Sequence, residues 1–471
     1  MKKNTPTLLL ALLLAPLAAM HAAEFHVAPN GNDSNPGTIT QPFATIQVGV
    51  NRLQPGDTLL VHGGVYRETI TFPRSGTEQK PIMLRSYKDE KVVITGCEPV
   101  TGWTLHDAAK NIWKAPMPWT LGTGRNQVFC GDEVLIEARF PNQPSRGLEM
   151  PVSGLSKLWP TFGEFANPEP GKQPGRIVSG LLDGQPDNFW KGALYLGIHY
   201  GGWSVQTGVI ESSKSGEIIV GDRGPIHWSA VHTSTADDGR GMIVGHMNAL
   251  DQPGEWHWQD DVLYLIPLSG TKPDNVVAKR RQRAFDLSGR EQIRVEGVSV
   301  HAGSARLQDS ADCVFDRCAF EFVSHFTKAG DSTSGDIGIV VSGHDNAFLN
   351  STIRYSAGAG IHLRGLRHTV HNCLINETDY SGHFLFSLYL EGADDFLTGG
   401  HTFTYNTLCN VGHSWYGNSP GGSRGRWRSP SLTLANLFAH NHAFNGTLLA
   451  RDWGSITGRY FSGGNLNGVP G

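Results

Sequence analysis

The sequence predicts an all-β solenoid, a parallel β-helix of short coils with an inserted or flanking β-rich region. Glycine is abundant, at 58 of 471 residues, and only 17% of the residues are charged, which suits short strands joined by tight turns. After residue 293, apolar segments recur in steps of 20, 33, 22, 34 and 35 residues. Repeats of this length mark solenoids, and the lack of helical periodicity within them favours strands over helices.

Residues 1–23 have the layout of a secretory signal peptide. A pair of lysines precedes an apolar run from Leu8 to Met20, and the small residues Ala22 and Ala23 follow. No later stretch approaches the roughly 20 apolar residues that cross a bilayer. We therefore expect a secreted protein, periplasmic or extracellular, with no membrane span.

Residues 24–100 are expected to form an N-terminal cap and the first coils. The stretch "FATIQVGVNRL", residues 43–53, predicts a short amphipathic helix that covers the open end of the solenoid, and "PGDTLLVHGGVYRETITF" predicts the first coiled strands. The stretch "PNGNDSN" resembles a calcium loop, but it is better interpreted as a turn rich in Asn and Asp.

Residues 101–280 break the period and predict an inserted region of irregular strands. Gly and Pro are frequent there, together with Trp103, Trp113, Trp203, Trp228, Trp256 and Trp258. Residues 281–471 then form the main coils. The chain stops at "GGNLNGVPG" with no further strand or capping element, so these coils are expected to be truncated at their C-terminal end.

The repeats align on one column, whose members are Gly297, Arg317, Asn350, Asn372, Asn406 and Asn441. Asn side chains at equivalent positions can bond from coil to coil across the strand spacing of about 4.8 Å. Cys318 and Cys373 follow the column by one position, with Ser351 between them. We expect both thiols inside the coils and about 10 Å apart, too far for a disulfide.

The formal charge of −4 is close to balanced. It gives no electrostatic reason to expect nucleic acid or a membrane surface as a partner.

Several segments together carry a resemblance to a known group of enzymes. The stretches "VAPNGNDSNPGTITQPFATI", "PGDTLLVHGGVYRE", "VLIEARFPN", "PGEWHWQDDVLYLIP" and "YSAGAGIHLRG" resemble right-handed parallel β-helix carbohydrate-active enzymes, the pectin-lyase-like glycoside hydrolases and polysaccharide lyases of bacteria. The resemblance covers most of the chain. It implies a right-handed parallel β-helix and an exported enzyme, expected to be a monomer, that degrades a polysaccharide or oligosaccharide. This fold hosts many chemistries, so it does not fix the substrate.

The loops that leave one edge of a solenoid build its binding groove. Positions seven, eight and eleven residues after the aligned column carry ionisable groups, namely Asp379 and His413, then His325 and Tyr380, then His383 and Asp452. Asp379 and His413 should lie one coil apart, at about 5 Å. The alternative is that these residues only cap coil turns.

Hydrolysis of a glycoside needs a protonated acid and a second carboxylate. Asp379 and Asp452 are the leading catalytic pair, and His413 would orient one of them or raise its pKa. The segment "RDWGSITG" resembles a late "DGGAIY"-like segment of the family but departs from it at Trp453, which weakens the role of Asp452.

Aromatic faces stack on sugar rings, and Arg forks bind carboxylate or sulfate, so the loop "HSWYGNSPGGSRGRWRSP" suggests an acidic sugar. The alternative is a flexible basic loop. The predicted substrate-binding residues are Tyr380, His383, His325, Trp415, Tyr416, Arg424, Arg426, Trp427, Arg451 and Trp453.

A glycoside hydrolase without metal or other cofactor is the leading prediction. The first alternative is a polysaccharide lyase acting by β-elimination on a uronate, with Ca²⁺ or Arg neutralising the carboxylate. Lys328 is the only lysine after Ala284, which disfavours a lysine base and leaves an Arg, Tyr380 or His413. The second alternative is a non-catalytic glycan-binding β-helix.

Overall fold

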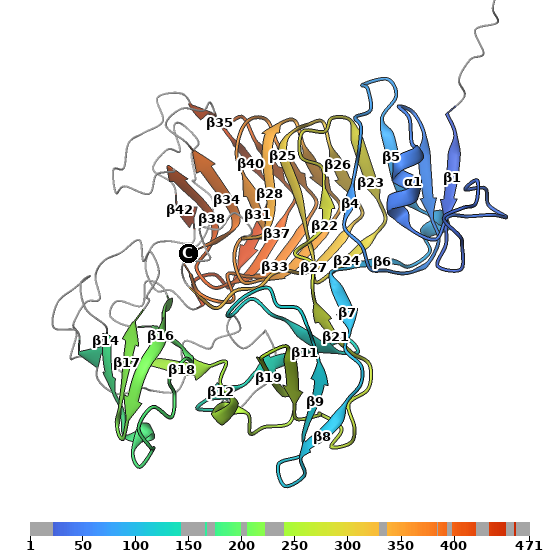
Figure 1. Cartoon of the computed structure of the whole chain (residues 1–471). Helices are drawn as coiled ribbons and strands as arrows, with labels where there is room; N and C mark the ends of the chain where they lie inside the picture. The colour runs from blue at the N-terminus through green and yellow to red at the C-terminus, as the bar shows by residue number, and fades with distance from the viewer. Residues whose placement is uncertain are drawn as a thin grey trace, which may run out of the picture.

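The computed structural model describes residues 22–142, 165–166, 175–198, 205–221, 240–328, 337–383, 385–392, 398–420, 433–448 and 456–457. The described backbone winds into stacked coils (Figure 1). Equivalent strands of successive coils pair with one another and form three parallel sheets. The first sheet contains β1 (Glu24–Val27), β2 (Thr58–Val61), β5 (Ile82–Ser86), β23 (Ile293–Glu296), β26 (Val314–Asp316), β29 (Ala347–Leu349), β32 (Thr369–His371), β36 (Thr402–Thr404) and β40 (Leu437–Ala439).

Each coil then turns into the second sheet and from there into the third. The second sheet contains β3 (Gly64–Tyr66), β6 (Val92–Thr95), β24 (Ser299–His301), β27 (Ala319–Ser324), β30 (Thr352–Ser356), β33 (Leu374–Thr378), β37 (Thr407–Val411) and β41 (His442–Phe444). The third contains β4 (Ile70–Thr71), β22 (Arg283–Asp286), β25 (Ser304–Ala311), β28 (Ile339–His344), β31 (Ile361–Leu363), β34 (Phe386–Gly392), β38 (Ser414–Pro420) and β42 (Ile456–Thr457). A short parallel pair joins β35 (Thr398–Gly399) to β39 (Thr433–Leu434).

The strands between β6 and β22 form two further sheets that are mostly antiparallel. One contains β7 (Cys97–Pro99), β21 (Val276–Lys279), β10 (Val128–Cys130), β11 (Glu133–Glu137), β19 (Glu255–Gln259), β20 (Val262–Leu265), β9 (Ile112–Pro116) and β8 (Thr104–Asp107). The other contains β12 (Arg139–Phe140), β18 (Arg240–Val244), β15 (Leu194–Ile198), β16 (Val205–Lys214), β17 (Glu217–Gly221), β14 (Gly175–Val178) and β13 (Phe165–Ala166). We call these strands and their connections the inserted region.

A helix, α1 (Ile46–Arg52), lies against β1, β2 and β4, as the sequence predicts for residues 43–53 (Figure 1). Its Ile46 and Val50 side chains are buried in the core of the coils. The Glu68 carboxylate accepts the Ile46 and Gln47 amides at 2.8 and 2.9 Å, which satisfies two free N–H groups at the start of the helix. Short 3₁₀ turns occur at Tyr87–Asp89, Gly180–Leu182 and Met247–Ala249.

One apolar core runs through the interior of the coils. Equivalent side chains stack from coil to coil, and the Phe315 and Phe348 rings lie parallel with centroids 5.3 Å apart. Each layer buries its face against its neighbours, which is the packing that the repeats predict. No helix among the described residues is long and apolar enough to cross a membrane.

From β23 onward, the turn between the first and second sheets contains one left-handed residue per coil. Positive φ values occur at Gly297, Arg317, Asn350, Asn372, Tyr405 and His440. Strand β32 pairs with β36 in a register that sets Thr369 opposite Thr402, so Tyr405 is equivalent to Asn372. The predicted column is therefore wrong by one residue at Asn406 and Asn441. The turn has the same length in both coils, and the asparagine lies one position further inward, a difference that the sequence does not reveal when both positions are polar.

The asparagines consequently form hydrogen bonds at two turn positions rather than at one. On the outer turn, Asn372 donates to the Asn350 side chain at 2.8 Å. One position inward, the Asn406 side chain accepts the Cys373 amide at 2.9 Å, and Asn441 accepts the Asn406 amide at 2.8 Å. The inner position also holds Cys318, buried in the core, and the prediction that Cys318 and Cys373 point inward is confirmed.

The inner bonds predict a stability effect at Asn406. Asn406→Ala would leave the buried Cys373 amide without its acceptor, so the free energy of unfolding should fall by about 2 kcal/mol in chemical denaturation. Asn406→Ser should recover part of the loss, because Ser351 accepts the Cys318 amide at the equivalent position two coils earlier. Equal stability of the alanine variant and the unaltered protein would contradict this role.

Candidate functional site

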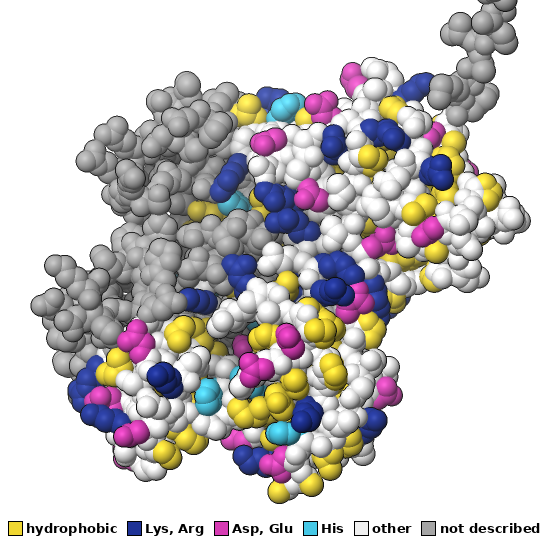
Figure 2. Space-filling view, in the orientation of Figure 1, with side chains coloured by type: hydrophobic (Ala, Val, Ile, Leu, Met, Phe, Trp, Pro, Cys, Tyr) yellow, Lys and Arg dark blue, Asp and Glu magenta, His cyan; other side chains and the backbone are white. Residues whose placement is uncertain are grey.

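The inserted region meets the coils at the edge where the strands of the second sheet end. The Phe129 ring packs edge-on against Phe322 at 4.9 Å, and the Thr327 amide donates to the Gly124 carbonyl at 2.9 Å. Further along the coils, the Val205 amide donates to the Gly382 carbonyl at 2.8 Å. This edge carries the loops on which the sequence places its candidate residues, and Figure 2 shows Lys and Arg side chains gathered beside it.

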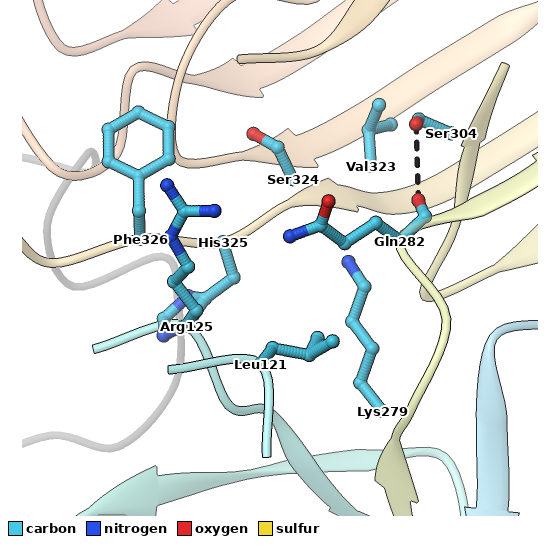
Figure 3. Close-up of a pocket in the computed structure, with 9 residues that line it drawn as sticks. All are labelled: Leu121, Arg125, Lys279, Gln282, Ser304, Val323, Ser324, His325 and Phe326. Atoms are coloured by element: carbon cyan, nitrogen blue, oxygen red, sulfur yellow. Dashed lines mark hydrogen bonds between the residues drawn. The ribbon is translucent and has the colours of Figure 1, made fainter. Parts of the chain in front are cut away.

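A hollow opens at this junction between the inserted region and the end of β27 (Figure 3). The residues that line it are Leu121, Arg125, Lys279, Gln282, Ser304, Val323, Ser324, His325 and Phe326. The Lys279 ammonium donates to the Gln127 side-chain oxygen at 3.3 Å and to the Phe322 carbonyl at 3.4 Å. Two lining residues are cationic and none of the nine is acidic, so the hollow favours an anionic group.

His325 and Tyr380 are brought together beside this hollow. The Tyr380 hydroxyl donates to the Ser324 carbonyl at 3.0 Å and lies 2.8 Å from the His325 Nδ1 atom. Tyr380 is buried, and burial raises its pKa well above the usual value. Burial, followed by the positive charge of Lys279, lowers the pKa of His325 to about 3, so this imidazole is neutral.

Asp379 shapes the loop that carries Tyr380. It has a left-handed backbone, with φ of 51°, and its Oδ1 atom accepts the His383 amide at 2.9 Å. The side chain is fully buried, and its Oδ2 atom has no hydrogen-bond partner among the described residues. Burial outweighs the amides of Leu385 and His383 and raises the pKa of Asp379 well above its usual value. Burial therefore favours the protonated form of this carboxyl group.

The predicted register between Asp379 and His413 is wrong by one residue. Thr378 pairs with Val411, so the residue beside Asp379 is Gly412. A Cβ atom at Gly412 would lie 1.9 Å from the Asp379 carbonyl oxygen, so only glycine fits there. His413 lies one residue farther on, fully buried, with its ring edge-on to Phe386 at 5.3 Å.

His383 lies in the same loop and bonds within it. Its Nδ1 atom is 2.7 Å from the Ser381 hydroxyl, which donates to the Ala357 carbonyl. The ring also packs against Phe326, a residue of the hollow, at 5.4 Å. The structure thus brings His325, Tyr380 and His383 to one edge.

Two predicted aromatic binding residues lie in the last described coils. Tyr416 is buried in the apolar core and contacts Phe403 and Phe438, so its prediction as a sugar-binding platform is wrong. Strand β38 turns this side chain inward. Trp415 is half-buried and donates to the Phe444 carbonyl at 3.0 Å. The other predicted residues, Asp452, Arg424, Arg426, Trp427, Arg451 and Trp453, lie outside the described residues, and their roles stay predictions.

Sequence reasoning missed the contribution of the inserted region to the hollow. Lys279 precedes the main coils, which the sequence predicts to begin at residue 281, and Arg125 lies in a stretch without repeats. The run "KRRQR", residues 279–283, was the available signal, because a dense basic run at the return to the coils is unusual in this weakly charged chain.

The described residues contain no group of three or more His, Cys, Asp or Glu side chains that could hold a metal ion. In "PNGNDSN", the Asp33 carboxylate accepts the Ala44 and Thr45 amides, both at 2.9 Å. The interpretation of this stretch as a turn is confirmed.

Comparison with known proteins agrees with the architecture. Residues 25–115 match the family model described as "Pel9A-like, right handed beta helix region". A solved structure described as "Glycoside hydrolase" superposes with a TM-score of 0.65 at 16% identity, covering 84% of this chain and 79% of the other. The chain is a right-handed parallel β-helix. The predicted fold class and the predicted resemblance to β-helix enzymes are confirmed.

Two curated proteins are similar to short segments of the β-helix chain. Pectate lyase PEL9 of Emericella nidulans is 40% identical over 82 residues, which is 17% of this chain and 20% of that protein. The uncharacterized protein YwoF of Bacillus subtilis is 42% identical over 71 residues, 15% of each chain. The matched part thus spans no more than a fifth of either relative.

Proposed function

We propose that this β-helix protein is a carbohydrate-active enzyme that cleaves glycosidic bonds at the junction of the coils and the inserted region, by hydrolysis. One observation carries the proposal: the Asp379 carboxyl is fully buried in a loop at this junction, and burial favours the protonated form that the leaving oxygen of a glycoside requires. The likeness of most of the chain to a structure described as a glycoside hydrolase supports the same class.

Hydrolysis also needs a group that activates water or attacks the sugar. Asp452 remains the proposed second carboxylate. His413 is proposed to orient either Asp452 or Asp379. Because Asp379 is fully buried, a substrate can reach its carboxyl group only if the residues that cover it move. The substrate is proposed to be an acidic polysaccharide or oligosaccharide, since Arg125 and Lys279 line the hollow.

The hollow itself favours a second candidate reaction, β-elimination at a uronate. A lyase needs cations around the sugar carboxylate and a neutral base near the adjacent ring proton. Arg125 and Lys279 could supply the first, and His325 could supply the second. The similarity of an 82-residue segment to a pectate lyase agrees with this alternative, in which Ca²⁺ could assist Arg125 and Lys279.

One assay separates the candidate functions. The purified protein should release reducing ends from an acidic polysaccharide without producing the ultraviolet absorbance of unsaturated uronates. Reducing ends together with that absorbance would identify a lyase. Binding without either signal, across neutral and acidic polysaccharides, would favour a non-catalytic glycan-binding protein and contradict the proposal.

Export through the N-terminal signal peptide is also proposed, on the basis of the apolar run in residues 1–23. N-terminal sequencing of the protein recovered from its natural host should begin near Ala23 or Glu24.

A further inference from the structure

A chain of hydrogen bonds fixes which nitrogen of His325 carries a proton. The Tyr380 hydroxyl has a single proton, and it donates this proton to the Ser324 carbonyl at 3.0 Å. The contact of 2.8 Å between the same hydroxyl oxygen and the His325 Nδ1 atom must then be a bond in which Nδ1–H donates. In a neutral imidazole this leaves the lone pair on Nε2.

The surroundings of His325 keep the ring neutral and beside a hollow of about 20 Å³, which is room for one water molecule. The ring lines the hollow (Figure 3) together with two cationic side chains of the inserted region, Arg125 and Lys279. Tyr380, from the coil two layers away, is a further titratable group in contact with it, and the Phe326 ring, which also lines the hollow, packs against His383. The nearby charge of Lys279 opposes protonation of His325.

We infer that His325 is the general base of this hollow, in place of the Asp452 carboxylate proposed above for hydrolysis, and that Tyr380 is the residue that positions it. This inference rests on the proposed function, because it assumes that a glycosidic bond is broken here. In hydrolysis, the oxygen of a water molecule bonds to the anomeric carbon and its proton passes to Nε2. The bond between the anomeric carbon and the leaving oxygen breaks, and the leaving oxygen takes the proton of Asp379.

The same nitrogen would serve an elimination. There the ring proton next to the sugar carboxylate passes to Nε2, its electron pair forms the new carbon–carbon double bond, and the bond to the leaving oxygen breaks. The leaving oxygen takes a proton from water. The assignment of the base is therefore independent of which of the two reactions occurs.

His371 provides a matched control for this arrangement. Its Nδ1 atom also bonds to a hydroxyl, that of Thr404, at 2.8 Å. It lies in β32, on the first sheet, whereas His325 follows β27 at the edge of the second sheet. A change at His371 removes the same kind of bond without touching the hollow.

The kinetic test compares three variants of the full chain. His325→Gln should lower kcat/KM by at least about 10²-fold, the lower scale for losing a positioned base, and should remove the acidic limb of its pH profile. Tyr380→Phe should lower kcat by about 10-fold with KM nearly unchanged. The base is still present, but without the Tyr380 hydroxyl its proton can lie on either ring nitrogen of His325. His371→Gln should behave like the unaltered protein. A folded His325→Gln variant that keeps its activity would overturn the inference and leave the proposed function standing.

A second measurement needs no substrate. In protein labelled with ¹⁵N-histidine, the signals lost in His325→Gln identify His325, and its Nε2 shift should be that of an unprotonated nitrogen at neutral pH. Tyr380→Phe should move this shift toward the average of two tautomers. A protonated Nε2 in the unaltered protein would overturn the inference even if glycan cleavage is found, whereas the expected shift with no cleavage of any glycan would sink the proposed function alone.

Discussion

Asp379→Asn is expected to lower turnover by at least about 10²-fold while the protein stays folded. The asparagine side chain has nearly the same volume, and its oxygen can still accept the His383 amide that the Asp379 carboxyl accepts at 2.9 Å. What the change removes is a carboxyl group whose protonated form burial favours. Initial rates of reducing-end release, with thermal melting measured on the same samples, check the prediction.

The control is another aspartate that holds a turn. Asp33 also accepts two backbone amides, those of Ala44 and Thr45, but it lies in the N-terminal cap. Asp33→Asn should leave turnover unchanged and cost about 1 kcal/mol or less of stability. If Asp379→Asn behaves in the same way, Asp379 only caps a turn, and the proposed hydrolytic acid is wrong.

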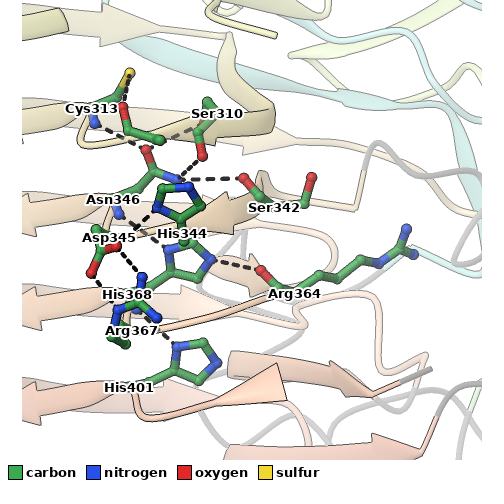
Figure 4. Close-up of polar contacts among 11 residues, drawn as sticks. Ser310, Cys313, Ser342, His344, Asp345, Asn346, Arg364, Arg367, His368 and His401 are labelled. Atoms are coloured by element: carbon green, nitrogen blue, oxygen red, sulfur yellow. Dashed lines mark hydrogen bonds and ion pairs between the residues drawn. The ribbon is translucent and has the colours of Figure 1, made fainter. Parts of the chain in front are cut away.

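Acid is expected to destabilise the fold through a ladder inside the coils. The Cys313 amide donates to Asn346 Oδ1 at 3.0 Å, the Asn346 amide to His368 Nδ1 at 3.3 Å, and the His368 amide to His401 Nδ1 at 3.0 Å (Figure 4). The His401 amide continues the ladder to Asn436 Oδ1 at 2.9 Å. Both imidazoles must be neutral to accept at Nδ1.

The direction of the pH effect follows from the two pKa values. Burial lowers the pKa of His368 to about 4 and that of His401 to about 3, whereas both are near 6.5 in an unfolded chain. Below pH 6.5 the unfolded chain therefore binds more protons than the folded one. The free energy of unfolding should fall as the pH drops from about 6.5 toward 4, by up to about 1.4 kcal/mol per pH unit for each histidine.

The ladder itself supplies the variant that tests this. Asn346 and Asn436 occupy the same place as the two histidines and accept the same kind of bond. His368→Asn with His401→Asn should keep stability near neutral pH and flatten its decline between pH 6.5 and 4. Chemical denaturation at several pH values measures both. A decline as steep as in the unaltered protein would show that other groups cause it.

The sequence was sufficient to predict those elements in which the apolar pattern directly determines which side is buried. The apolar spacing in residues 43–53 predicts α1, because one face of that segment must be buried wherever it packs. The repeat around Cys318 and Cys373 predicts inward-facing thiols for the same reason, since each coil buries one side of each strand. The register near Asn406 failed because a shift of one residue exchanges an outer turn position for an inner one without changing residue type.

The repeats alone predict a solenoid of β-coils with ionisable loops along one edge, because each repeat must pack against its nearest neighbours. Which residues face the hollow depends on how the inserted region packs against the coils. Lys279 and Arg125 come from the inserted region, which carries no repeat to align with the coils, and they meet His325 across the fold. The physical reason is that a site between two parts of a chain depends on how those parts pack against each other. The sequence repeat of one part contains no information about its contacts with the other.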